Sequence, residues 1–134
     1  MEITVSVESG RVPITVLHVN GSLDGSSYQE FQSMAKKLID GGTRYILVDL
    51  SDAPFVSSAG LRALHLISSE LRSRNPAANL SDEQMKRGIS AGTHKSPHLK
   101  LLNLSPQTKT AFETSGFDMY IDTFTDLKTA IASF

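Results

Sequence analysis

A change of hydrophobic period within residues 45–71 constrains the fold of this chain more than any other feature. The segment YILVDLS, residues 45–51, begins with four apolar residues and leaves no polar face, as expected of a strand buried on both sides. After Ser57 and Ser58 the apolar residues recur at helical spacing, at Leu61, Leu64, Ile67 and Leu71. A buried strand that leads directly into an amphipathic helix predicts an α/β fold with parallel strand pairs.

The rest of the chain repeats this alternation. Apolar and polar residues alternate over residues 3–7, which predicts an edge strand with one face in water, whereas residues 14–20 read as a second buried strand. Two later strands are predicted from HLKLLNL, residues 98–104, and from MYIDTF, residues 119–124. The sequence therefore indicates about five strands.

Helix starts and stops separate these strands. Ser27 and Glu30 have the spacing of a capping box, which predicts a helix from Tyr28 that ends at Gly41-Gly42. Ser105-Pro106 and Gly116 bound another helix. The C-terminal helix is expected to dock by one apolar stripe, made of Leu127, Ala130, Ile131 and Phe134.

Residues 75–97 break the pattern. They are polar, small and rich in helix breakers, and they read as a long loop or an excursion from the core, in which residues 82–87 have the signals of a short helix. The prediction is one domain over residues 1–134, with a mixed sheet of about five strands, four main helices mostly on one face, and this polar loop.

Composition excludes several classes of function. With 13 Lys and Arg against 14 Asp and Glu, the net charge of -1 gives no basic field for nucleic acid. The absence of cysteine excludes disulfides and thiolate chemistry and fits the cytoplasm. The N-terminus lacks the pattern of a secretory signal, and no apolar run approaches the roughly 20 residues that span a bilayer, so membrane insertion is not expected.

Ser57 and Ser58 have both a structural and a functional interpretation. A serine at a helix start commonly caps an unpaired N–H, which is worth about 1 kcal/mol. The turn also resembles the nucleophile elbow of esterases, but Val56 stands where the first glycine of Gly-x-Ser-x-Gly belongs, and His65 lies two turns along the same helix. Hydrolysis at this turn is therefore disfavoured, and no catalytic residue is predicted.

The other polar candidates favour structural interpretations. His94 and His98 do not read as a metal pair because Pro97 interrupts the helix that would align them, so solvated loop histidines are expected, with no metal and no cofactor. His18 lies in an apolar strand and reads as a hydrogen-bonded core histidine. Asp24 and Asp49 each adjoin a turn, where aspartate accepts backbone hydrogen bonds.

Three short segments carry a family resemblance when they are taken together with the order of strands and helices. They are Gly21-x-Leu23-Asp24, Asp49-Leu50-Ser51 and Ser58-Ala59-Gly60-Leu61. In this order and spacing the chain resembles the STAS domain of anti-sigma factor antagonists over nearly its whole length, with residues 75–97 the part that fits least.

The resemblance implies a regulatory protein rather than an enzyme. A serine at the start of the second helix, here Ser58, would be phosphorylated by an anti-sigma factor that is also a GHKL-type kinase, and a metal-dependent serine/threonine phosphatase would reverse the reaction. The best-known members place an aspartate where this chain has Ser57, which is the less favoured acceptor. Partner-binding residues would lie on the two segments around this serine: Gly21, Leu23, Asp24, Ser26, Ser57, Ser58, Ala59, Gly60 and Leu61.

Physical chemistry supports Ser58 as a phosphorylation site independently of the resemblance. The first N–H groups of a helix lack intrahelical partners and carry positive partial charge, so a phosphate there is accepted without unfolding the domain. The alternative is a non-phosphorylated STAS interaction subunit of a signalling scaffold or a transporter-associated complex. The sequence leaves the oligomeric state open between a monomer and a homodimer.

Overall fold

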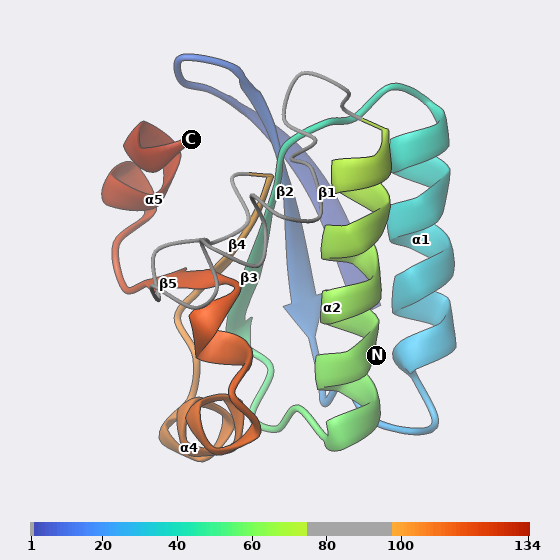
Figure 1. Cartoon of the computed structure of the whole chain (residues 1–134), viewed down its shortest axis with the longest axis vertical. Coiled ribbons are helices and arrows are strands. Elements are labelled where there is room, and N and C mark those ends of the chain that lie inside the picture. The colour runs from blue at the N-terminus through green and yellow to red at the C-terminus, as the bar shows by residue number, and fades with distance from the viewer. Residues whose placement is uncertain (1, 75–97) are drawn as a thin grey trace, which may run out of the picture.

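A computed structural model describes residues 2–74 and 98–134 of the chain (Figure 1). The strands are β1 (Glu2–Ser9), β2 (Pro13–Asn20), β3 (Ile46–Asp52), β4 (Leu99–Leu102) and β5 (Asp122–Phe124). The helices are α1 (Tyr28–Asp40), α2 (Ser58–Ser73), α4 (Pro106–Ser115), the 3-10 helix η2 (Phe117–Met119) and α5 (Leu127–Ser133). The predicted loop over residues 75–97 and its short helix lie outside the described residues.

The strands form one mixed sheet in the order β1-β2-β3-β4-β5. β1 pairs antiparallel with β2, and each of the following neighbours pairs parallel. β3 therefore lies at the centre, which is why Ile46, Leu47 and Val48 are fully buried. This mixed α/β sheet confirms the predicted fold class.

The two faces of the sheet are covered differently. α1 and α2 run side by side across one face (Figure 1), over a core that includes Leu17, Val48 and Phe31. On the other face, Ala130 of α5 packs against a smaller cluster of buried residues: Ile14, Val16, Leu47 and Leu102. Most of the helical cover is thus on one face, as predicted, and α5 is the exception. No helix within the described ranges is long and apolar enough to cross a membrane.

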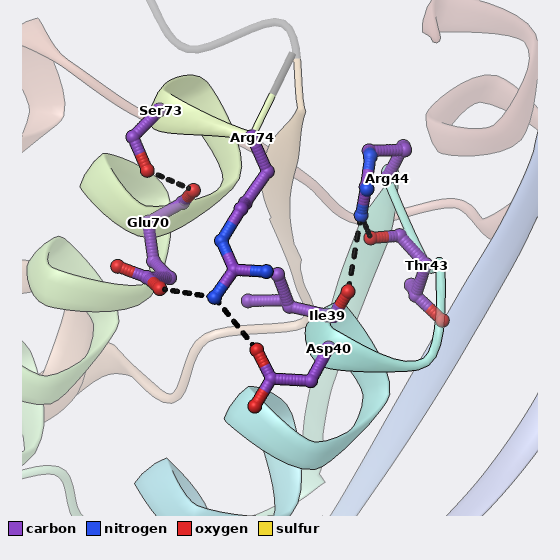
Figure 2. Close-up of polar contacts among 7 residues, drawn as sticks. All are labelled: Ile39, Asp40, Thr43, Arg44, Glu70, Ser73 and Arg74. Carbon is purple, nitrogen blue, oxygen red and sulfur yellow. Dashed lines mark hydrogen bonds and ion pairs between the residues drawn. The ribbon is translucent and has the colours of Figure 1, made fainter.

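Arg74 links the C-terminal ends of α1 and α2. Figure 2 shows its guanidinium between Asp40 of α1 and Glu70 of α2, with Nη2 2.7 Å from Asp40 Oδ1 and 3.3 Å from Glu70 Oε1. Nearby, Arg44 Nη1 donates to the carbonyl oxygens of Ile39 and Thr43 at 3.0 Å each. The ion pairs of Arg74 join the two helix ends, but exposed ion pairs of this kind contribute little stability.

The capping box predicted for Ser27 and Glu30 is wrong. Ser27 is the N-cap residue of α1, but its side chain makes no capping hydrogen bond. Its hydroxyl donates instead to the carbonyl of Ser22 at 2.8 Å and accepts the amide of Asp24 at 3.1 Å. The hydroxyl is engaged by the preceding loop and is not available to the helix.

Two apolar stripes are less buried than the sequence predicts. β1 is the edge strand, as expected, but Val5 is 43% and Val7 68% exposed, because an edge strand has one neighbour and only Ile3 packs against the main core. In α5, Ala130 is buried and Ile131 and Phe134 pack against the smaller cluster, whereas Leu127, the first residue of this short helix, is 40% exposed.

Candidate functional site

The loop after β2 and the start of α2 form one surface, which we call the switch surface (residues 21–27 and 55–61). A parallel bridge joins Leu23 to Val56. The amide of Leu23 donates to the carbonyl of Phe55 at 3.0 Å, and the amide of Ser57 donates to the carbonyl of Leu23 at 2.9 Å. Two segments about 30 residues apart in the sequence are thereby held in a fixed relation.

Gly60 allows this close approach. A Cβ atom at Gly60 would lie 2.5 Å from the carbonyl oxygen of Leu23 and 2.8 Å from Cγ1 of Val56. Both distances are far below van der Waals contact, and the nearer atom belongs to the backbone. The glycine in the Ser58-Ala59-Gly60-Leu61 segment is therefore required by contact with the loop of the first segment.

Ser57 and Ser58 have different environments. Ser57 is the N-cap of α2: it is extended, with φ -79° and ψ 177°, and its hydroxyl accepts the amide of Gly60 at 3.4 Å. Ser58 is the first residue of α2 and is exposed, and its hydroxyl has no hydrogen-bond partner among residues 2–74 and 98–134. Ser57 therefore caps α2, whereas the Ser58 hydroxyl faces solvent at the helix start.

Asp24 organises the loop beside the helix start. Its Oδ1 atom accepts the hydroxyl and the amide of Ser26 at 2.7 and 2.9 Å, and its backbone carbonyl accepts the amide of Tyr28 at 2.9 Å. The hydrogen bonds to the carboxylate, above all the one from the Ser26 hydroxyl, lower the pKa of Asp24 below its ordinary value. The predicted acceptance of backbone hydrogen bonds is confirmed, and the loop presents a carboxylate.

An open groove of about 710 Å³ adjoins Ser58, between the start of α2 and the outer face of α4. The described residues that line it include Phe55, Ser58, Pro106, Thr110 and Ala111, and none of them is charged. Phe55 is 45% exposed. Sequence reasoning predicted the helix α4 but placed neither α4 nor Phe55 in the site. An apolar residue placed after Pro54, in a turn, was a usable signal, whereas the packing of α4 beside α2 has no local signal.

Comparison with known proteins identifies the family. A model of the STAS domain matches residues 5–80, more than half of the 134 residues. The chain belongs to the STAS domain family. This confirms the resemblance carried by the three sequence segments. No curated protein matches the chain.

Three solved structures illustrate the fold that this chain shares with other proteins. An anti-sigma factor antagonist from Mycobacterium paratuberculosis has a TM-score of 0.66 and 18% identity, with 97% of this chain and 94% of that chain covered. An anti-sigma-factor antagonist (STAS) domain protein from Planctomyces limnophilus has a TM-score of 0.67 and 14% identity, with 96% and 94% covered. The Bacillus cell fate determinant SpoIIAA in its phosphorylated form has a TM-score of 0.59 and 18% identity, with 96% of each chain covered. At these identities the similarity establishes the STAS fold.

The STAS domain brings most of the predicted site residues together, but not all of them are accessible. Ser26 and Ser58 are exposed, and Gly21, Asp24, Ser57 and Ala59 are half-buried. Leu23, Gly60 and Leu61 are buried, so a partner docked on the folded domain would not reach most of their surface. These three residues support the switch surface from beneath.

The Asp49-Leu50-Ser51 segment does not join the switch surface. Leu50 is buried in the core. Burial alone would raise the pKa of Asp49, but hydrogen bonds from the hydroxyl and amide of Ser51 and from His18 outweigh it, and the pKa is lowered. Asp49 accepts the Ser51 amide at 3.0 Å, as predicted, and its second oxygen lies 2.9 Å from His18 Nδ1.

The histidines differ from the sequence predictions. His18 is hydrogen-bonded, as expected, but it is not a core residue, because its side chain is 40% exposed on the sheet face opposite α1 and α2. His98 is not a solvated loop histidine: it is 1% exposed, lies against the ring of Tyr45, and burial lowers its pKa. His94 lies outside the described residues.

His65 stacks on Phe117, with ring centroids 5.4 Å apart. Within the described ranges, no group of three His, Cys, Asp or Glu residues could hold a metal ion.

Proposed function

We propose that this STAS domain is an anti-sigma factor antagonist, which acts in the cytoplasm through a switch surface that binds a partner and catalyses no reaction. It binds an anti-sigma factor with GHKL-type serine kinase activity through the switch surface, and this binding releases the sigma factor. Phosphorylation of Ser58 ends the binding, and a metal-dependent serine/threonine phosphatase restores it. The observation that carries the proposal is the exposed hydroxyl of Ser58 in the first turn of α2, which has no hydrogen-bond partner in the described part of the chain, within a domain of this family.

The position of Ser58 supports a switch that leaves the fold intact. A phosphate at the first helical residue lies beside unpaired backbone N–H groups and the positive end of the helix dipole. The Ser57 hydroxyl already caps the helix, so modification of Ser58 removes no hydrogen bond among the described residues. The domain therefore stays folded when it is phosphorylated.

The negative charge of a phosphate on Ser58 is unfavourable for a docked partner. A phosphate adds about -1.5 to -2 charges, which a protein seated on the helix start must desolvate or repel. Asp24 adds a carboxylate to this surface, so the modified site becomes strongly anionic. Like-charge contacts across an interface cost several kcal/mol, and about 1.4 kcal/mol is a tenfold change in affinity. Affinity for the anti-sigma factor should fall at least ~100-fold.

Phosphate mapping tests the assignment of Ser58. The chain is incubated with ATP and its cognate GHKL-type anti-sigma kinase, and the modified residue is located by mass spectrometry. Wild type and Ser57→Ala should carry one phosphate on Ser58, and Ser58→Ala should carry none. Phosphate on Ser57, or no phosphate in wild type, would contradict the proposal.

One observation favours a second function on the same fold. Ser57 stands where the resemblance implies an aspartate, and its hydroxyl performs the capping without supplying a carboxylate. A kinase that recognises that carboxylate would not recognise this chain, which would then be a constitutive interaction subunit of a signalling or transporter-associated assembly. Comparing the partner affinities of Ser58→Ala and Ser58→Asp separates the two functions, because a scaffold whose interface lies elsewhere tolerates the charge.

A further inference from the structure

We propose that Ser6 is a nucleophile, activated by His18 and Asp49, that short uncharged or cationic acyl esters can acylate. The three side chains come from three adjacent strands, β1, β2 and β3, and meet on the sheet face opposite α1 and α2. Ser6 Oγ lies 3.0 Å from His18 Nε2, and His18 Nδ1 lies 2.9 Å from Asp49 Oδ2. Serine and carboxylate thus occupy opposite nitrogens of one imidazole, which is the arrangement of a nucleophile, a general base and its orienting group.

The direction of the hydrogen bonds follows from the chemistry of Asp49. Hydrogen bonds from Ser51 and His18 lower the pKa of Asp49, so the carboxylate is ionised at neutral pH and can only accept. The proton of a neutral His18 therefore lies on Nδ1, and Nε2 carries the free lone pair. The Ser6 hydroxyl then donates to Nε2, which places its proton where a general base removes it.

The site is accessible. The side chain of His18 is 40% exposed and that of Asp49 is 17% exposed. α5 packs on this face over Ile14, Val16 and Leu47, which precede the two site residues on their strands. A small reagent can therefore approach Ser6 from the half of the face that carries the imidazole.

The edge position of β1 supplies a donor for the developing oxyanion. Thr15 lies opposite Val7 in the β1–β2 ladder, and its amide donates to the carbonyl of Tyr45, on the side of β3. An antiparallel ladder with this register directs the Val7 amide away from β2, toward the outer edge of the sheet. The N–H of the residue after the nucleophile is the donor that esterases use for the oxyanion.

The reaction is ordinary acyl transfer. Ser6 Oγ bonds to the carbonyl carbon of the ester, and its proton passes to His18 Nε2. The bond from that carbon to the alcohol oxygen breaks, and the alcohol leaves with the proton. Water, deprotonated by the same nitrogen, then releases the carboxylic acid and restores Ser6. Glu8 is two residues along β1 and Asp49 is ionised, so anionic substrates are disfavoured.

A fluorophosphonate probe tests the nucleophile directly, because it labels activated serines by forming an Oγ–P bond as fluoride leaves. The intact chain is treated with an alkyl fluorophosphonate, and the adduct is located by mass spectrometry. Wild type and the control Ser73→Ala should be labelled on Ser6, since the Ser73 hydroxyl donates only to a backbone carbonyl. His18→Gln should lower the labelling rate at least ~100-fold, the ordinary contribution of a general base, and Asp49→Asn at least ~10-fold.

A cysteine variant keeps the test independent of whether the histidine variant folds well. The chain has no cysteine, so Ser6→Cys and the control Ser73→Cys each carry a single thiol. Iodoacetamide should alkylate the first at least ~10-fold faster, because an adjacent imidazole increases the thiolate fraction. Equal alkylation rates, no adduct on wild-type Ser6, or an adduct formed equally fast in a folded His18→Gln variant would overturn the proposal.

Discussion

Replacing Gly60 by alanine tests whether the close approach of the loop after β2 to α2 builds the switch surface. The new Cβ atom would lie 2.5 Å from the Leu23 carbonyl oxygen, whereas such contacts are essentially never under 3.0 Å, so the two backbones must separate by at least 0.5 Å. Overpacking of this kind costs about 1–3 kcal/mol, and weakening the hydrogen bond from the Ser57 amide to Leu23 costs about 1 kcal/mol more. Alanine recovers up to about 1 kcal/mol of helix propensity.

The expected net loss is about 1–3 kcal/mol of unfolding free energy, which for a domain of this size lowers the melting temperature by roughly 3–12 °C. The chain has no tryptophan, so the measurement is urea and thermal unfolding followed by circular dichroism. Gly25→Ala is the matched control, because a Cβ atom there meets nothing within 4 Å, and its stability should be unchanged or slightly raised. If Gly60→Ala melted like Gly25→Ala, the steric account of this surface would be refuted.

Three further predictions concern other parts of the domain. Ser57→Ala should lower the unfolding free energy by about 0.5–1 kcal/mol through loss of the cap, whereas Ser58→Ala should change it by less than about 0.5 kcal/mol; equal losses in urea unfolding would contradict the assigned roles. The folded-state pKa of Asp49 is lowered, so the stability that this carboxylate contributes is fully present above its ordinary pKa and is lost as the pH falls through the folded-state pKa. Stability measured from pH 6 to pH 2 should therefore fall less in Asp49→Asn than in wild type, and parallel curves would refute this. Lys100 donates to the carbonyl and hydroxyl of Ser133 at 2.8 and 2.9 Å, so Lys100→Ala should speed amide hydrogen exchange in α5 but not in α1; unchanged exchange in α5 would show that other contacts hold the helix.

Most of the architecture could be predicted because its signals are local. The stripe of α2, with Leu61, Leu64, Ile67 and Leu71, is buried as its spacing predicts. Ser105 caps α4 by accepting the Thr108 amide at 3.2 Å, and Gly116 ends it with φ +83°. Each of these features depends on residues within one element, so periodicity and capping rules suffice.

Three of the incorrect predictions concern side chains whose partners are distant in the sequence or whose hydroxyl has a competing local hydrogen bond. His98 is buried and lies against Tyr45, 53 residues away in the chain, and this contact has no signal in the polar segment before His98 or in the apolar run after it. His18 is half-exposed and belongs to a polar network with Ser6 and Asp49, which come from the strands on either side of β2. The Ser27 hydroxyl does not cap α1 because it donates to the Ser22 carbonyl and accepts the Asp24 amide instead.

The candidate site also has a part that the sequence predicts and a part that only the packing reveals. Ser58 and the loop segment could be found from the sequence because their residue types and spacing resemble a family. That Gly60 lies beneath the Leu23 carbonyl, and that α4 and Phe55 form a groove beside the serine, follows only from the packing.

The most direct test of the central claim is the affinity of Ser58-phosphorylated and unmodified protein for the same anti-sigma factor, measured by titration calorimetry, with a melting curve for each form. The account predicts at least ~100-fold weaker binding of the phosphorylated form and an unchanged or slightly raised melting temperature. Equal affinities, or a loss of affinity that accompanies unfolding of the modified domain, would contradict it.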